Sequence, residues 1–137
     1  LSKIGRLLLG DGEVDGVRLL TPASVRAMIG PQWSWKDGNG LTLEEDDPIR
    51  TKGGFTCRYG LAVHTLATGL PDCGDDPFGD GVQRIGHSGN AYGLLAGLWV
   101  DRKAGTGVVY FSTGNDKPEA GERSAFSRVE EQSAAGW

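Results

Sequence analysis

The chain lacks both a long apolar run and an excess of basic residues. No uninterrupted apolar stretch approaches the ~20 residues that a helix needs to cross a bilayer, so we expect no membrane span. Lysine and arginine number 14 against 18 aspartates and glutamates, which gives a formal net charge of −4. A nucleic-acid partner requires a clustered basic face, so the charge balance argues against one.

Cysteine is scarce as well, with Cys57 and Cys73 as the two copies. A disulfide between them would close a loop of about 16 residues and stabilise the fold by about 3 kcal/mol in the chain-entropy model. Two free thiols in a reducing compartment are an equally ordinary arrangement, and both alternatives stay open. A disulfide would favour a periplasmic or secreted location; without that knowledge the location is undetermined.

The sequence contains two histidines, His64 and His87. Together with Cys57 and Cys73 they could form a zinc site, but the spacings match neither the C-x₂-C nor the H-x₃₋₅-H pattern. The acidic run at residues 44–47 also lacks the aspartate spacing of a calcium loop. We therefore expect no metal and no cofactor.

The 137 residues suffice for one domain with a core, so residues 1–137 are interpreted as a single domain or a fragment of one. Helical spacing predicts a first helix over residues 2–9, ended by Gly10 as a left-handed cap; its apolar positions are Leu1, Ile4, Leu7 and Leu8. Whole proteins rarely begin inside a helix, so we expect this chain to be the C-terminal piece of something longer.

Turn and capping signals follow the first helix. The Asp15-Gly16 pair predicts a type I′ hairpin, because both residues tolerate positive φ. Thr21-Pro22 predicts the start of a second helix, with the Thr21 hydroxyl as cap and the proline at the first helical position. Gly30 predicts the end of that helix.

From Phe55 the apolar residues alternate with polar ones. This period predicts one half-buried strand that runs to His64, with the histidine on the more polar face. Residues 67–81 are rich in Gly, Pro and Asp and are predicted to form a loop.

Three further strands are predicted at residues 82–87, 94–101 and 107–113. The last two are apolar on both faces, so we expect both to lie between layers and to pair as an antiparallel hairpin.

Residues 115–137 are predicted to be a charged tail and a terminal helix. Ser124 is the expected cap of this helix, and Phe126 and Val129 supply its modest apolar face. The expected fold class is α+β, an antiparallel sheet with helices packed on it.

The segment with most chemistry is Gly86-His87-Ser88-Gly89-Asn90. It begins like the nucleophile elbow G-x-S-x-G, but Asn90 stands where the last glycine belongs. The elbow also requires a helix directly after it, and a strand is predicted there. The nucleophile elbow is therefore rejected.

A better match is to a family. His87-Ser88-Gly89, followed by the strand at 94–101 and its hairpin partner, resembles the C-terminal part of the class C β-lactamase-like serine hydrolases. That group includes penicillin-binding DD-peptidases, esterases and D-aminopeptidases. The stretches 4–9 and 15–25, and Tyr59-Gly60-Leu61, also resemble it. The resemblance extends from about residue 2 to residue 115 and implies the C-terminal portion of that fold.

The resemblance implies roles for five residues. His87 would be catalytic, helping proton transfer or stabilising negative charge, as an imidazole can. Ser88 would hydrogen-bond the substrate, Gly89 would leave room for it, and the backbone N–H of Asn90 would be one oxyanion-hole donor. Tyr92 is close enough in sequence to border the cleft.

The family's nucleophile motif is absent from these 137 residues, since no serine has a lysine three positions later. Tyr110-Phe111-Ser112 fits the letters of the family's Y-x-S motif, but it follows His87 instead of preceding it. We therefore expect the serine and lysine to come from a missing upstream segment or a separate chain. The expected protein partner is the missing N-terminal segment or a second copy of the chain. His87 stands where β-lactamases carry lysine, which favours an esterase- or peptidase-like member.

The resulting expectation is a hydrolase of a small-molecule ester, amide or peptide, acting through an acyl-enzyme and inactive as this chain alone. In the family the first and last portions of the chain share one sheet, so we expect an uncovered apolar face or strand edge and association into a dimer. The alternative hypothesis is a non-catalytic binding or assembly module on the same scaffold.

Overall fold

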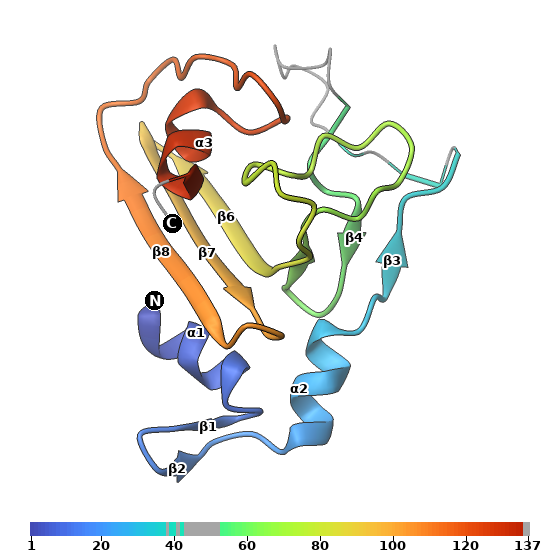
Figure 1. The fold of residues 1–137 in the computed structure, drawn as a ribbon, viewed down its shortest axis with the longest axis vertical. Coiled ribbons are helices and arrows are strands. Elements are labelled where there is room, and N and C mark those ends of the chain that lie inside the picture. The colour runs from blue at the N-terminus through green and yellow to red at the C-terminus, as the bar shows by residue number, and fades with distance from the viewer. Residues whose placement is uncertain (38, 41, 43–52, 136–137) are drawn as a thin grey trace.

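The computed structural model describes residues 1–37, 39–40, 42 and 53–135 (Figure 1). Its helices are α1 (Ser2–Leu9), α2 (Pro22–Ile29) and α3 (Arg128–Ala135). A small sheet pairs β1 (Glu13–Val14) with β2 (Val17–Arg18). The main sheet has the order β3-β4-β5-β6-β7-β8, and every neighbouring pair is antiparallel. The prediction of an α+β fold with an antiparallel sheet is confirmed; the acidic run 44–47 lies outside the described residues.

The strands of the main sheet differ greatly in length. Three are two residues long: β3 (Trp33–Ser34), β4 (Arg58–Tyr59) and β5 (His64–Thr65). The other three are long: β6 (Ile85–Ala91), β7 (Leu94–Asp101) and β8 (Thr106–Ser112). The long strands therefore form the body of the sheet, and the short ones extend it on one side (Figure 1).

The first helix and the hairpin after it form as predicted, apart from the cap. Asp15 and Gly16 have φ of 52° and 77°, the positive values that a type I′ turn requires. Gly10 ends α1 but has φ −85°, so the prediction of a left-handed cap there is wrong. The backbone reverses one residue later, at Asp11 and Gly12, and Gly10 instead permits close approach: a Cβ on it would lie 2.3 Å from the Glu13 carbonyl oxygen.

The second helix also forms as predicted. The Thr21 hydroxyl accepts a hydrogen bond from the Ser24 backbone N–H at 3.0 Å, and Pro22 is the first helical residue. Gly30 ends α2, and its N–H bonds the Arg26 carbonyl oxygen at 2.9 Å. These local signals set the helix boundaries without help from the rest of the chain.

The prediction of a single strand from Phe55 to His64 is wrong. The chain reverses between β4 and β5, where Ala62 has φ 59° and the Gly60 N–H bonds the Val63 carbonyl oxygen at 2.8 Å. A side chain on Gly60 would lie 2.1 Å from the Met28 carbonyl oxygen, so α2 contacts the backbone directly at this turn. His64 is consequently buried, 4% exposed, and does not lie on a polar face.

The strand predicted at 82–87 begins later and extends further, as β6. His87 therefore lies in the middle of the strand. Tyr92 and Gly93, with φ of 53° and 75°, form a two-residue turn into β7 that the sequence analysis did not identify. The β7 boundaries and the antiparallel β7–β8 hairpin are as predicted.

Two core clusters lie on opposite faces of β7. Successive side chains of a strand point to opposite faces, and Leu98 and Val100 pack with Leu8 of α1 and Val25 of α2. Trp99 packs on the other face in a second cluster, whose other buried members are Leu66, Val108 and Phe126. β7 is thus covered on both faces, as predicted.

The prediction that both faces of the strand are covered is wrong for β8. This strand ends the sheet, with β7 as its one strand partner among the described residues. Phe111 is 73% exposed and Val109 36%. Among the described residues the outer edge of β8 is therefore uncovered, and the strand carries exposed apolar side chains.

The terminal helix begins later than predicted, and its cap is Ser127, not Ser124. The Ser127 N–H donates to the Glu130 carboxylate at 2.9 Å, and the Glu130 N–H donates to the Ser127 hydroxyl at 3.4 Å, which is a capping box. Phe126 is buried before the helix starts, and Val129 is half-buried. Ser124 instead donates from its hydroxyl and its N–H to the Glu131 carboxylate, at 2.7 Å each.

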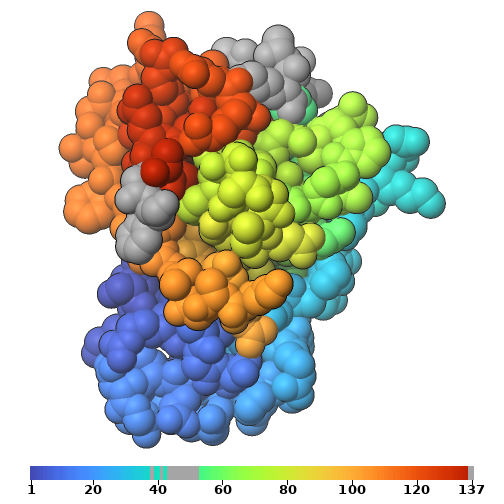
Figure 2. Space-filling view, in the orientation of Figure 1, coloured from blue at the N-terminus to red at the C-terminus, as the bar shows by residue number. Residues whose placement is uncertain are grey.

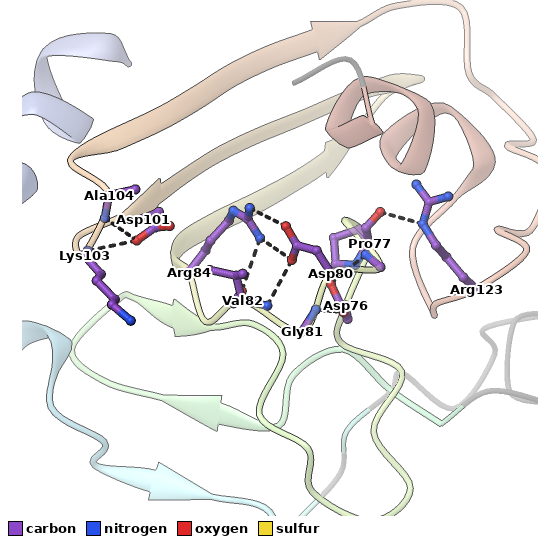
Figure 3. A network of polar contacts seen from close by, with 11 residues as sticks. Asp76, Pro77, Asp80, Gly81, Val82, Arg84, Asp101, Lys103, Ala104 and Arg123 are labelled. Atoms are coloured by element: carbon purple, nitrogen blue, oxygen red, sulfur yellow. Dashed lines mark hydrogen bonds and ion pairs between the residues drawn. The ribbon is translucent and has the colours of Figure 1, made fainter.

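The loop at residues 67–84 is held by carboxylates (Figure 3). Asp80 accepts two hydrogen bonds from the Arg84 guanidinium, at 2.9 and 2.8 Å, and these lower the pKa of Asp80 to about 2. Asp76 accepts from two backbone N–H groups of the loop, and Arg123 donates to the Pro77 carbonyl oxygen at 2.9 Å. The loop therefore lies against the C-terminal segment, as Figure 2 also shows (yellow-green beside red).

A disulfide joins Cys57 and Cys73, with the Cα atoms 6.1 Å apart. It connects the start of the β4–β5 hairpin to the loop 67–84. Of the two alternatives that the sequence leaves open, the structure has the bonded one.

We expect the double substitution Cys57→Ser, Cys73→Ser to lower the free energy of unfolding by about 3 kcal/mol, because it releases a loop of about 16 residues in the unfolded chain. Urea denaturation followed by circular dichroism measures this change. Adding a reductant to the native chain should reproduce the loss and leave the double variant unaffected. Equal stability of the two proteins under oxidising conditions would contradict the prediction.

Candidate functional site

The candidate site lies along a strand edge that is only half paired. β5 pairs with β6 at two positions, Thr65 with Ile85 and His64 with Gly86. On the same side, residues 87–91 have no strand partner in the part of the chain that the structure describes. β6 pairs with β7 along its whole length on the other side. The segment that carries the His-Ser-Gly motif is therefore an open edge (Figure 1).

The pairing also determines which backbone groups face the open edge. In antiparallel strands, the residues that hydrogen-bond to one neighbour alternate with those that bond to the other. Arg84 bonds toward the β5 side, since its carbonyl oxygen accepts from the Leu66 N–H at 2.8 Å. Counting in twos from Arg84, the N–H and C=O groups of Ser88 and Asn90 also face this side.

The His87 ring has hydrogen-bond partners at both nitrogens. Its Nδ1 contacts the Ser88 carbonyl oxygen, and its Nε2 lies 2.9 Å from the Tyr59 hydroxyl oxygen. A carbonyl oxygen only accepts, so Nδ1 carries the proton, and Nε2 of the neutral ring accepts from the Tyr59 O–H. The two partners select one tautomer and one orientation of the ring.

The ring of His64 packs against the rings of both His87 and Tyr59. Its ring centroid is 4.4 Å from that of His87 and 4.6 Å from that of Tyr59. Burial lowers the pKa of His64 to about 4, and the neighbouring His87 acts in the same direction. At neutral pH the His64 ring is therefore uncharged and packs as an aromatic side chain, next to Phe55 and Trp99.

Sequence reasoning missed Tyr59 and His64 as members of this cluster. The sequence singles out Tyr59 as part of the Tyr59-Gly60-Leu61 pattern, and it singles out His64 as one of two histidines. The β4–β5 turn that brings both residues to His87 was not visible, because an alternating pattern is the same for one long strand and for two short ones.

An open cavity of about 340 Å³ lies beside the motif, between the sheet and the helices α1 and α2. Its surface is mainly apolar, and the larger apolar side chains that line it are Leu1, Ile4, Leu8, Met28, Val63 and Leu98. None of the described residues that line it is Asp, Glu, Lys or Arg. A pocket of this size and polarity suits a small uncharged ligand.

The structure brings three of the five predicted site residues together. His87, Ser88 and Gly89 all border the cavity. Asn90 is exposed at the open edge. Tyr92 is fully exposed at the tip of the β6–β7 turn and is not among the residues around the cavity.

The hypothetical zinc site on Cys57, His64, Cys73 and His87 is wrong, because the two sulfur atoms are bonded to each other. Within the described residues, no group of three or more His, Cys, Asp and Glu side chains is placed to hold a metal ion. No described helix is both long and apolar enough to cross a bilayer.

Comparisons of the chain with protein-family models, with curated proteins and with solved structures find no match. The resemblance to the class C β-lactamase-like hydrolases therefore rests on the motifs quoted above.

Removing the Tyr59 hydroxyl should weaken the preference of the His87 ring for the Nδ1–H tautomer. In Tyr59→Phe the Nε2 atom loses its donor, so we expect the ratio of the Nδ1–H to the Nε2–H tautomer to fall about fivefold, the equivalent of about 1 kcal/mol for one hydrogen bond. Nitrogen-15 NMR of the neutral imidazole measures this ratio. Tyr92→Phe, which removes an exposed hydroxyl, is the control and should leave the ratio unchanged; an unchanged ratio in Tyr59→Phe would refute the assignment.

His64 should make stability depend on pH. Its pKa is about 4 in the fold and about 6.5 when unfolded, so the unfolded chain binds more protons between these values. The free energy of unfolding should therefore fall by about 3 kcal/mol as the pH drops from 7 to 4. His64→Phe should lack this component. Burial raises the pKa values of Asp75 and Glu130, but both groups titrate in the native chain and in His64→Phe, so their contributions cancel when the two stabilities are subtracted. If the free energies of unfolding of the two proteins changed in parallel with pH, the lowered pKa of His64 would be contradicted.

Proposed function

We propose that this chain forms one wall of the substrate cleft of a serine hydrolase similar to the class C β-lactamase-like enzymes. The reaction would be hydrolysis of an ester or amide through an acyl-enzyme. The observation that carries the proposal is the open edge of β6, where His87, Ser88 and Gly89 border an apolar cavity. Such a combination of an apolar cavity with a few converging polar groups is typical of substrate sites.

The backbone at this edge suits stabilisation of an oxyanion. The N–H of Asn90 faces the open side, so it can donate to charge that develops on a substrate carbonyl oxygen. Gly89 leaves space beside it, because a Cβ there would meet only the Ala96 Cβ, at an ordinary 3.7 Å. These features support the substrate-binding roles of Ser88, Gly89 and Asn90 that the resemblance implies.

The Tyr59–His87 pair supports a role in proton transfer. A proton can move from the Tyr59 hydroxyl to Nε2 of His87 along the 2.9 Å hydrogen bond, while Nδ1–H stays on the Ser88 carbonyl oxygen. The transfer would leave a Tyr59 phenolate beside the imidazolium, so the pair stays neutral overall and the phenolate is the group that would accept a proton from the reacting groups. His87 would thus act together with Tyr59 and not as an isolated base.

The acylated serine would come from outside these 137 residues, since the chain contains no S-x-x-K. Tyr110-Phe111-Ser112 does not replace the missing motifs. Burial raises the pKa of Tyr110, as does the nearby Glu130 carboxylate, so the phenol stays protonated at neutral pH. The nucleophile would come from another segment of the same gene product, and the disulfide favours an oxidising compartment for the enzyme.

A second candidate function is a non-catalytic assembly module. The observation that favours it is the uncovered edge strand β8 with its exposed Phe111 and Val109. A strand from a partner could pair with this edge. The experiment below separates the two candidates.

We expect the gene to encode S-x-x-K, followed by Y-x-N or Y-x-S, in frame before the codon of Leu1. The longer protein should then be labelled by a fluorophosphonate and should hydrolyse p-nitrophenyl esters, whereas the 137-residue chain alone should do neither. In the longer protein, His87→Ala should lower kcat/KM about 100-fold, the usual size of an acid–base contribution. Lys103→Ala, on the exposed β7–β8 turn, is the matched control.

Two results would refute the hydrolase. One is a gene without either motif in frame, which would favour the assembly module. The other is stoichiometric labelling of the 137-residue chain itself, which would mean that the nucleophile lies among its own serines.

A further inference from the structure

We infer that the cavity beside β6 binds the uncharged apolar chain of the substrate, so that the preferred substrates are esters or amides with a short acyl chain and no carboxylate. This inference rests on the proposed function and names its substrate class.

The cavity arises because small residues of the sheet lie under large residues of the helices. At Gly5 helix α1 lies directly on β7, since a Cβ there would be 2.9 Å from a methyl group of Leu98. Further along the sheet, Gly89 and Ala96 are too small to fill the space that Ile4 of α1 and Met28 of α2 enclose from the other side. The space is therefore bounded by a rigid sheet on one side and by two helices on the other.

The surface of the cavity selects for an uncharged ligand. None of the described residues that line it is Asp, Glu, Lys or Arg. Its one titratable side chain among them is His87, whose two ring nitrogens already contact the Tyr59 hydroxyl and the Ser88 carbonyl oxygen, so a substrate carboxylate would find no free cationic partner there. A dry cavity of about 150 Å³ accommodates a benzene ring, so about 340 Å³ has room for a chain of about six to eight carbons.

The cavity and the open edge share His87, Ser88 and Gly89. A chain that fills the apolar part would therefore bring its carbonyl group to the edge where the Asn90 N–H points outward. The apolar part supplies affinity in proportion to the area it buries, and the edge supplies the polar contacts.

The single methionine of the chain makes the cavity directly observable. Met28 lines it, so the Met28 methyl group gives one unambiguous NMR signal at this site. We expect this signal to shift in the 137-residue protein on titration with octanamide, a neutral probe that cannot be hydrolysed easily. From butanamide to octanamide, each added methylene should strengthen binding about fourfold. Contacts between the probe and the Met28 methyl should appear as intermolecular NOEs.

Two alanine variants form a matched pair. Ala96→Leu places a larger side chain at the wall of the cavity and should weaken octanamide binding at least tenfold. Ala104→Leu makes the same change on the exposed β7–β8 turn and should alter binding less than twofold. The NOE measurement on the native chain needs no variant, so the test does not depend on how well Ala96→Leu folds.

The inference is overturned if the Met28 signal does not respond to octanamide, if affinity does not grow with chain length, or if a folded Ala96→Leu binds as well as the native chain. Loss of binding in a longer product of the same gene would also overturn it, because protein would then fill the cavity. Binding without any hydrolysis by that longer product would refute the hydrolase and leave the ligand site intact. Hydrolysis by the longer product at rates that do not depend on acyl length would refute the apolar ligand site and leave the hydrolase intact.

Discussion

The unequal pairing of β6 is the constraint on which the rest of the structure depends. Seven residue pairs join β6 to β7, but only two join it to β5. Pairing with β7 holds the whole strand in place. Pairing with β5 ends at Gly86, so that residues 87–91 have no strand partner on that side among the described residues. Because the pairing is antiparallel, the same register also determines that Ser88 and Asn90 direct their backbone groups outward.

Side-chain size maintains this arrangement. Gly86 is the last residue paired with β5, and a Cβ on it would lie 1.7 Å from the Leu98 carbonyl oxygen and 2.9 Å from the Trp99 ring. The indole of Trp99 is fully buried and anchors the opposite face of the sheet. A larger residue at 86 would therefore displace either β7 or Trp99, and the His87 ring next to it would lose its alignment with Tyr59. The packing of the core and the geometry of the candidate site are linked through this one glycine.

Capping and turn residues predict helix ends and tight turns, because these features depend on residues close together in the sequence. Thr21-Pro22 and Gly30 bound α2 in both the prediction and the structure, and Asp15-Gly16 forms the expected turn. The Ser127-x-x-Glu130 capping box is also present in the sequence, and this pattern distinguishes Ser127 from the predicted cap Ser124.

Contacts between distant residues could not be predicted in the same way. Tyr59 and His87 are 28 positions apart, and no periodic pattern connects them. His64 was expected on a polar face because one long strand was assumed, whereas the turn at Ala62 buries it. The motif itself was found, since His87, Ser88 and Gly89 are adjacent, but the cavity beside it depends on how α1 and α2 pack on the sheet.

Amide hydrogen exchange along β6 tests the central claim most directly. The open edge predicts alternation: the N–H groups of His87 and Gly89, which face β7, should exchange slowly, and those of Ser88 and Asn90 should exchange at least tenfold faster under native conditions. Equal protection of all four amides would contradict the account, because it would show that something covers this edge of the sheet.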